Sequence, residues 1–355
     1  TDDNYKDWMV LNGNKIEDVG SGDLPVYDTK IDMNGNYIFP GLIDSHIHVY
    51  SLGRMSTRLH LDKPGSIMEL QNRLQKYVVE NSHLEWIVAH DWDQDYMEDG
   101  RYPNKSDIDL IVSDRPVLLF RSGNHIAIMN SKALDVIGIT SETINPEGGI
   151  IDKDEDEEPT GILRETAISM VTEYIRIKDD QTRKKIIMAG LDHCLSIGLT
   201  MVQTNDPNCW QIYKELEAEN KLPIRVALTL FYADLDIENV PSPNTKINLL
   251  TCDRVKLFTD GSLGGQTAAL RDVYSDTKKM GVTIHTQDEL NTKVKRIKDL
   301  GFRLEVHAIG DLAAEYTLNS FEQAGLSLED RPILTHGQVL SEDLISRMTK
   351  SGVIV

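Results

Sequence analysis

Short apolar runs alternate with amphipathic stretches along most of the chain after residue 41. The runs are rich in Val, Ile and Leu, which is typical of strands buried on both faces. Stretches between them, such as 211–221 and 287–300, repeat apolar residues at helical spacing. The alternation predicts an α/β fold with a parallel sheet, and the number of units favours a (β/α)8 barrel. The predicted strands cover residues 38–50, 198–205, 224–231, 254–261, 302–310, 331–337 and 352–355.

The first forty residues have a different pattern. Two Asn-Gly turns, at Asn12-Gly13 and Asn34-Gly35, lie between short apolar runs. Asn-Gly in that setting is a strong hairpin signal. We therefore expect a small β domain over residues 1–40 and a barrel domain over residues 41–355.

A long interruption, about residues 51–190, separates the first predicted barrel strand from the second. It contains predicted strands at 86–93 and 115–123, a predicted helix at 130–139, and the acidic stretch "DKDEDEEPTG". The simplest interpretation of the acidic stretch is a solvated hairpin end, and a loose cation site is the alternative. We expect this insertion to lie outside the regular barrel pattern.

Charge and cysteine content limit the partners and the compartment. The net charge is −20, from 37 basic and 57 acidic residues, which argues against nucleic acid or an anionic membrane as a partner. The three cysteines are scattered, which favours a reducing compartment. The chain shows neither a signal peptide nor an apolar run of about 18 residues. We expect a soluble, cytoplasmic protein.

Histidines mark the ends of three predicted strands. His46 and His48 in "IDSHIHVY" point to one face of a strand, where they can share a metal ion or belong to a buried core. Those two residues alone leave both readings open. His307 in "LEVHAIGD" and His336 in "ILTHGQ" end two later strands. Because parallel strands of a barrel end at one mouth, we expect the four imidazoles to converge there as metal ligands.

Lys256 lies within the apolar strand "VKLFTDG". Burial of an uncharged polar group without a hydrogen-bond partner costs about 2–7 kcal/mol, and burial of an unpaired charge costs more. A buried ammonium is therefore expected to be paired or neutralised. One interpretation pairs the lysine with a carboxylate such as Asp253 or Asp260. The other is a lysine that carries CO2 as a carbamate and bridges two metals.

Segments throughout the chain resemble the amidohydrolase superfamily, and within it the YtcJ-like branch that includes N-substituted formamide deformylases. The segments are "FPGLIDSHIHVY", "EPTGILRE", "VKLFTDGSLGGQTAAL", "EVHAIGD" and "LTHGQ". The resemblance implies a TIM-barrel metal-dependent hydrolase with a long insertion after the first strand. It also implies that residues 1–40 are part of a small β-sandwich domain.

The resemblance also implies a metal site. His46 and His48 would bind one metal, and carbamylated Lys256 would bridge to a second metal held by His307 and His336. A metal-bound hydroxide would attack the substrate carbonyl. One or two Zn2+ ions suit these ligands, although iron, cobalt and manganese stay open. Lys256 and His307 are thereby the catalytic candidates.

The end of the chain departs from the family pattern. The family has a general-base aspartate after its eighth strand, whereas "SGVIV" at 351–355 resembles the seventh strand. We expect the aspartate beyond residue 355, and a barrel that lacks its last strand-helix units. Asp114 in "VSDRP" imitates the missing motif, but it precedes an insertion strand and is expected to be a turn residue.

Further candidates carry weaker signals. His125, Trp92 and Glu165 are substrate-binding candidates in the insertion; a structural hydrogen bond, packing and a helix start are their respective alternatives. Asp311 and Gln338, which follow His307 and His336, are candidates to orient the imidazoles, with loop solvation as the alternative.

The leading functional hypothesis is a metal-dependent amidohydrolase that cleaves a C–N bond of a small molecule, foremost an N-substituted formamide. An esterase, lactonase or deaminase that uses the same site is the alternative, because one barrel supports many chemistries. A non-catalytic metal-binding barrel is the further alternative if the chain end is native. We also expect a homodimer.

Overall fold

The computed structural model describes residues 5–355 except 124, 147–148, 176, 178 and 276–277. The chain separates into two compact units, residues 1–41 and residues 42–355. Each unit is described by itself.

The first unit contains one hairpin. Its strands β1 (Trp8–Asn12) and β2 (Lys15–Gly20) are antiparallel, and Asn12 pairs with Lys15 across the two-residue turn. The first predicted hairpin is therefore confirmed. At the second Asn-Gly pair the turn forms, with Asn36 N donating to Met33 O at 2.9 Å, but residues 21–41 contain no strand. The expected strands there are wrong because the flanking apolar side chains are exposed and find no partner strand; they include Ile31, Tyr37 and Phe39.

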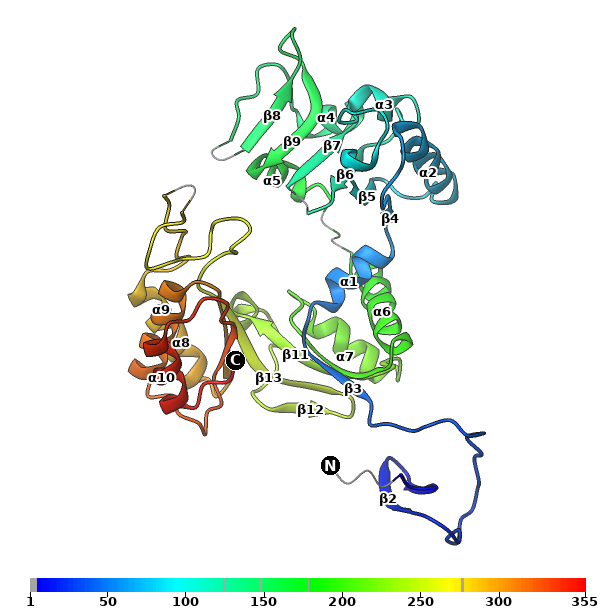
Figure 1. Ribbon diagram of the computed structural model, residues 1–355, viewed down its shortest axis with the longest axis vertical. Helices are drawn as coiled ribbons and strands as arrows, with labels where there is room; N and C mark the ends of the chain where they lie inside the picture. Colours follow the sequence, from blue (N-terminus) through cyan, green and yellow to red (C-terminus); the bar gives the residue numbers. More distant parts are fainter. Residues whose placement is uncertain (1–4, 124, 147–148, 176, 178, 276–277) are drawn as a thin grey trace. The chain divides into compact units, whose positions relative to one another are not determined.

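The second unit is built on a parallel sheet whose strands follow one another in sequence order (Figure 1). The order confirms the strand alternation predicted from the apolar runs. Ile354 adds a parallel bridge to Ile333, at the position of the seventh predicted strand. The short β12 (Thr245–Ile247) is antiparallel to β13. The parallel strands are β3 (Leu42–Ile47), β10 (Leu199–Thr204), β11 (Arg225–Phe231), β13 (Leu250–Phe258), β14 (Arg303–Ala308) and β15 (Ile333–His336).

Helices cover one face of this sheet. Alternate strand residues such as Val255 and Leu257 belong to the core shared with the helices, so Lys256 between them faces the other side. α1 and α6 approach so closely that a Cβ on Gly53 would lie 1.9 Å from Ile186 O. The helices are α1 (Val49–Ser56), α6 (Asp180–Ser196), α7 (Trp210–Ala218), α8 (Gln287–Asp299), α9 (Asp311–Gln323) and α10 (Glu342–Ser351), with a 3-10 turn η3 (Tyr232–Asp236).

The sheet is curled. β3 and β15 lie at opposite ends of the strand order, yet the rings of His46 and His336, at the ends of these strands, are only 5.3 Å apart. A flat sheet of this width would keep its outer strands about 24 Å apart, at roughly 4.8 Å per strand. A parallel curled sheet with helices outside is a TIM-barrel-like fold, as the sequence predicts.

The insertion forms a second, mixed sheet in the order β4-β5-β6-β7-β9-β8. The predicted strands at 86–93 and 115–123 correspond to β5 and β6, and the predicted helix at 130–139 to α4; the acidic stretch spans the β8–β9 hairpin. The segment from 180 is α6, which packs on α1, so the insertion ends earlier than about residue 190. Its elements are β4 (Leu59–His60), α2 (Ile67–Glu80), β5 (Ile87–Trp92), η1 (Gln94–Tyr96), α3 (Lys105–Asp109), β6 (Val117–Arg121), β7 (Ile126–Met129), α4 (Ser131–Ile137), β8 (Gly149–Lys153), β9 (Pro159–Glu165), η2 (Thr166–Ile168) and α5 (Ser169–Thr172).

Three smaller expectations can be compared with the structure. Asp114 lies in the turn before β6 with an exposed carboxylate, as expected. The cysteines are free and buried; they are Cys194, Cys209 and Cys252. Among the described residues, no helix combines the length and the apolar character that crossing a membrane requires.

Candidate active site

The first two histidines are held at the end of β3. The backbone N of His46 donates to Asp44 Oδ1 at 3.0 Å, so Asp44 shapes the strand end. His46 Nδ1 lies 3.2 Å from Glu305 Oε1, and His48 Nδ1 lies 2.9 Å from Asn205 O. The two imidazole rings are 5.3 Å apart and nearly perpendicular.

The other two histidines complete the group from β14 and β15. The rings of His307 and His336 are 4.7 Å apart. Regular strand geometry would direct residue 336 to the helix side together with Leu334. The φ of 81° at His336 breaks that geometry, and the ring turns to His307 and His46 instead. Such a conformation costs a non-glycine residue about 1–3 kcal/mol. The structure thus brings the four predicted histidines together.

The hydrogen bonds of three imidazoles leave one nitrogen of each ring available. A carbonyl or carboxylate oxygen only accepts, so Nδ1 of His46 and Nδ1 of His48 each donate, and Nε2 of each neutral ring keeps its lone pair. His307 is oriented the other way, because its Nε2 lies 2.9 Å from Gly261 O, and among the described residues no hydrogen bond reaches its Nδ1. Metal-binding histidines characteristically have one nitrogen tied to a carbonyl or carboxylate in this manner.

Lys256 is paired with Glu305, a residue that the sequence analysis did not single out. The Nζ–Oε1 distance is 3.0 Å, and both side chains are buried. The carboxylate also accepts from Thr229 and Thr335, at 3.3 Å each, and lies 3.4 Å from the guanidinium of Arg254. Glu305 therefore links β3, β11, β13, β14 and β15 inside the curl.

Of the two lysine partners suggested by the sequence, neither is the observed one. Asp253 forms ion pairs with Arg254 and Arg303. Asp260 accepts three backbone N–H groups, from Ala269, Ile309 and Gly310. Lys256 is therefore paired with a carboxylate, as one of the two interpretations predicts, but the carboxylate is that of Glu305. The signal for Glu305 was its position two residues before His307, on the same face of the strand.

Burial and neighbouring charges shift the pKa values of three groups in this cluster. Burial lowers the pKa of Lys256, and the nearby carboxylate of Glu305 opposes that effect only partly. Burial acts to raise the pKa of Glu305, but the hydrogen bond from His46 and the charges of Lys256 and Arg254 outweigh it, and the net pKa falls below the usual range. Burial and the neighbouring charges of His307, Lys256 and His46 lower the pKa of His336 to about 4. His336 is neutral at pH 7, as a metal ligand must be.

The carboxylate beside His307 is Asp260. Its Oδ1 lies 3.3 Å from His307 Nε2, and it has no exposed surface. Asp311, the predicted orienting residue, instead accepts from the backbone N of Arg271 and of Leu312 at the start of α9. That expectation is wrong because α9 begins at Asp311 and turns its carboxylate towards its own first turn.

Gln338, the second predicted orienting residue, is exposed. No hydrogen bond joins it to an imidazole in the part of the chain that the structure describes. Loop solvation, the alternative, fits its position.

The substrate-binding candidates separate into two groups. Trp92 is fully buried in the insertion core, and its Nε1 donates to Leu119 O at 2.9 Å, so it has the packing role named as the alternative. His125 and Glu165 are both exposed and pair at 2.9 Å, between the start of β7 and the end of β9. Glu165 has a φ of 51°, outside regular strand geometry. The structure brings this pair together.

The donor chemistry of the cluster fits a divalent metal. Four imidazoles lie in one connected group, three of them with an oriented lone pair, and His46 of that group shares the carboxylate of Glu305 with the buried Lys256. As the side chains stand, no three His, Cys, Asp or Glu residues among those described converge on a single point.

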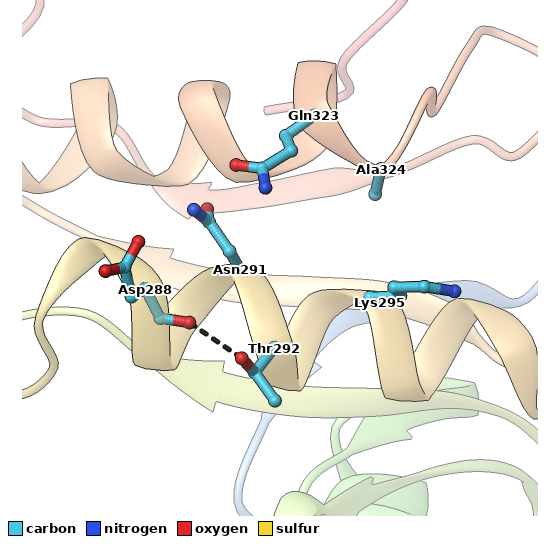
Figure 2. Close-up of a pocket in the computed structure, with 6 residues that line it drawn as sticks. All are labelled: Asp288, Asn291, Thr292, Lys295, Gln323 and Ala324. Atoms are coloured by element: carbon cyan, nitrogen blue, oxygen red, sulfur yellow. Dashed lines mark hydrogen bonds between the residues drawn. The ribbon is translucent and has the colours of Figure 1, made fainter.

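A hollow on the surface of the barrel unit lies between α8 and α9 (Figure 2). Thr292 Oγ1 donates to Asp288 O on the α8 side of this hollow. The lining contains none of the predicted site residues, so we do not assign the chemistry to this hollow. The lining residues are Asp288, Asn291, Thr292, Lys295, Gln323 and Ala324.

Comparisons with known proteins cover most of the chain. The model of the amidohydrolase family matches residues 29–355. The putative amidohydrolase YtcJ of Bacillus subtilis is 30% identical over 91% of this chain and 63% of its own length. The N-substituted formamide deformylase of Arthrobacter pascens is 22% identical over 88% of this chain and 62% of its own length.

The structural comparison extends over nearly the whole chain. The crystal structure of an uncharacterized metal-dependent hydrolase from Pyrococcus furiosus matches with a TM-score of 0.78 and 30% identity. The match covers 97% of this chain and 71% of that protein. The chain spans less than two thirds of the two curated relatives named above.

Proposed function

Since the chain belongs to the amidohydrolase family, we propose that it carries the metal site of a hydrolase that cleaves the C–N bond of an amide. The leading substrate class is an N-substituted formamide. The observation that carries the proposal is the meeting of His46, His48, His307 and His336 beside buried Lys256, at the carboxyl ends of the strands.

The residues that would hold the metal are His46, His48, Lys256, His307 and His336, with zinc as the first candidate. Bound there, a divalent metal would polarise a substrate carbonyl and lower the pKa of a water molecule.

The burial of Lys256 supports carbamate formation. Only the unprotonated amine attacks CO2, and burial lowers the pKa of Lys256. In this step the neutral Nζ would form a bond to the carbon of CO2, the π electrons of one C=O bond would move to its oxygen, and the proton lost from Nζ would pass to solvent, which gives a carbamate with an anionic oxygen donor. Glu305 would then lose its contact with the ammonium and keep its other donors, among them His46 and Arg254.

His125 and Glu165 remain our candidates for substrate contact, because both side chains are exposed and neither is needed by the insertion core. A second class of reaction at the same site is hydrolysis of an ester or a lactone, or deamination. The amide is preferred because the matching family is an amidohydrolase family and a deformylase is among the relatives. A homodimer and a cytoplasmic location stay predictions.

Metal analysis and turnover, measured together, test the proposal. The purified complete protein is offered N-substituted formamides, cyclic amides, lactones and aminopurines in parallel. We expect formamide hydrolysis, and we expect His46→Ala and His307→Ala to lose both metal and activity. His193→Ala is the matched control, because this histidine is exposed on α6. Unchanged metal content and turnover in both site variants would remove the proposal; lactone or aminopurine turnover alone would replace the amide with the second class.

A further inference from the structure

Residues 204–206, at the end of β10, accept hydrogen bonds from residues 48–50, which directly follow β3. Asn205 N also donates to Ile47 O at 3.2 Å, which joins the two strand ends. Each member of the triplet accepts one hydrogen bond from one member of 48–50. The bonds are Val49 N to Thr204 Oγ1 at 3.0 Å, His48 Nδ1 to Asn205 O at 2.9 Å and Tyr50 N to Asp206 Oδ1 at 2.9 Å.

The carboxylate of Asp206 is itself fixed. It is fully buried, and Oδ2 accepts from Thr204 Oγ1 and from Tyr213 OH, at 2.7 Å each. Because the Thr204 hydroxyl donates to Asp206, its lone pair is turned to Val49 N. The hydrogen bonds form one connected network that ends at the first turn of α1.

This network takes over a task that the residue before a helix usually performs. His48 is the N-cap of α1, and its side chain makes no capping hydrogen bond. The first N–H groups of a helix have no partner within the helix and need an external acceptor. Thr204 and Asp206 supply these acceptors to Val49 and Tyr50, so the ring of His48 is free of capping.

We propose that Thr204, Asn205 and Asp206 position His48 for ligand binding. Thr204 and Asp206 cap α1 in place of His48, and the carbonyl of Asn205 fixes the imidazole in the tautomer with hydrogen on Nδ1 and a lone pair on Nε2. Asp206 and Thr204 are positioning residues that act through His48. The inference rests on the proposed function in that the ligand of Nε2 is the metal of that site.

The tautomer of His48 gives a test that does not depend on activity. In metal-free protein labelled with 15N at histidine, nitrogen shifts report which ring nitrogen carries the proton, and His48→Gln assigns the signal. We expect a single Nδ1–H tautomer in the wild type. Asp206→Ala and Thr204→Val should give a mixture of tautomers and weaken zinc binding at least about tenfold, the usual effect of losing a group that orients a ligand.

Conservative and matched variants separate positioning from general support. Asp206→Asn keeps an acceptor oxygen for Tyr50 and should restore most of the tautomer and zinc affinity. Asp234→Ala is the control, because Asp234 is a buried carboxylate near the end of β11 that accepts from Phe231 N and Asn208 N. The Asp234→Ala variant should change neither the tautomer of His48 nor the zinc affinity. If Asp206→Ala does not fold, Thr204→Val carries the test.

The result that would overturn the inference is a folded Asp206→Ala or Thr204→Val variant with the wild-type tautomer and zinc affinity. Equal effects of Asp234→Ala and Asp206→Ala would also overturn it, because both would then reflect general loss of structure. A wild-type protein that binds no metal and hydrolyses none of the substrates would refute the proposed function alone. The tautomer comparison still decides the positioning role in that case.

Discussion

The ammonium of Lys256 lies 3.0 Å from the carboxylate of Glu305, and the two residues belong to adjacent strands, β13 and β14. His46 and Arg254 share the same carboxylate. One buried anion therefore serves three cationic or hydrogen-bonding groups from two other strands, β3 and β13. Its removal would affect stability and the predicted metal site together.

Replacement of Glu305 by Gln should lower the free energy of unfolding by about 3–5 kcal/mol, because breaking a buried ion pair leaves uncompensated charge. Urea denaturation measures the change. Glu322→Gln is the control, because its pair with Arg347 is partly exposed and should contribute at most about 1 kcal/mol. Equal losses in the two variants would mean that Glu305 is not the centre of the network.

Metal loading of the protein should depend on CO2. Apo-protein reconstituted with zinc in bicarbonate-free buffer should bind less metal than apo-protein reconstituted with bicarbonate, because an uncarbamylated Lys256 is no oxygen ligand. With 13C-bicarbonate, a carbamate carbon signal should appear in the wild type and disappear in Lys256→Met. Equal metal content with and without bicarbonate, and no carbamate signal, would exclude the carbamate and leave Lys256 as the partner of Glu305.

Two substrate candidates from the sequence should behave differently on replacement. Trp92→Ala removes a fully buried indole and should cost about 3–5 kcal/mol of stability. His125→Ala removes an exposed imidazole and should change stability by no more than about 0.5 kcal/mol. If His125 contacts substrate, that variant raises KM or lowers kcat while Tm stays constant. Unchanged kinetics would remove His125 from the site.

The buried thiols should resist alkylation in the native protein. Burial raises the pKa of Cys209 to about 12, and that of Cys252 to about 12. The thiolate is the reactive form, so at pH 8 the native fraction is far below that of an ordinary thiol with a pKa of about 8.5. Iodoacetamide should label both residues in denaturant and neither in native protein at pH 8. Raising the pH from 8 to 9.5 should increase the rate of native labelling by about thirtyfold from its very low value, because the thiolate fraction far below the pKa rises tenfold per pH unit. A rise of only about fourfold, as for a thiol with a pKa of about 8.5, would contradict the expected pKa values.

The amino-acid sequence by itself determined the order of the barrel strands, the first hairpin and the residues at the strand ends. Apolar periodicity and Asn-Gly turns are local signals, and tertiary packing left them intact in β10, β11, β13 and β14. The second Asn-Gly turn shows the limit of such signals. It forms, but a hairpin also requires flanking strands that pair, and none exists among residues 21–41.

Only the tertiary structure decided which of the polar residues meet. Curling of the sheet brings His46 to His336, and the unusual φ of His336 turns its ring inward. Strand register, which the sequence does not encode locally, sets Lys256 opposite Glu305 in place of Asp253 or Asp260. Likewise, α9 begins at Asp311, so the carboxylate of Asp311 faces the first turn of that helix, and Asp260 is the carboxylate that lies beside His307. Contacts between strands distant in sequence depend on curl, register and helix starts, and these follow from packing of the whole sheet.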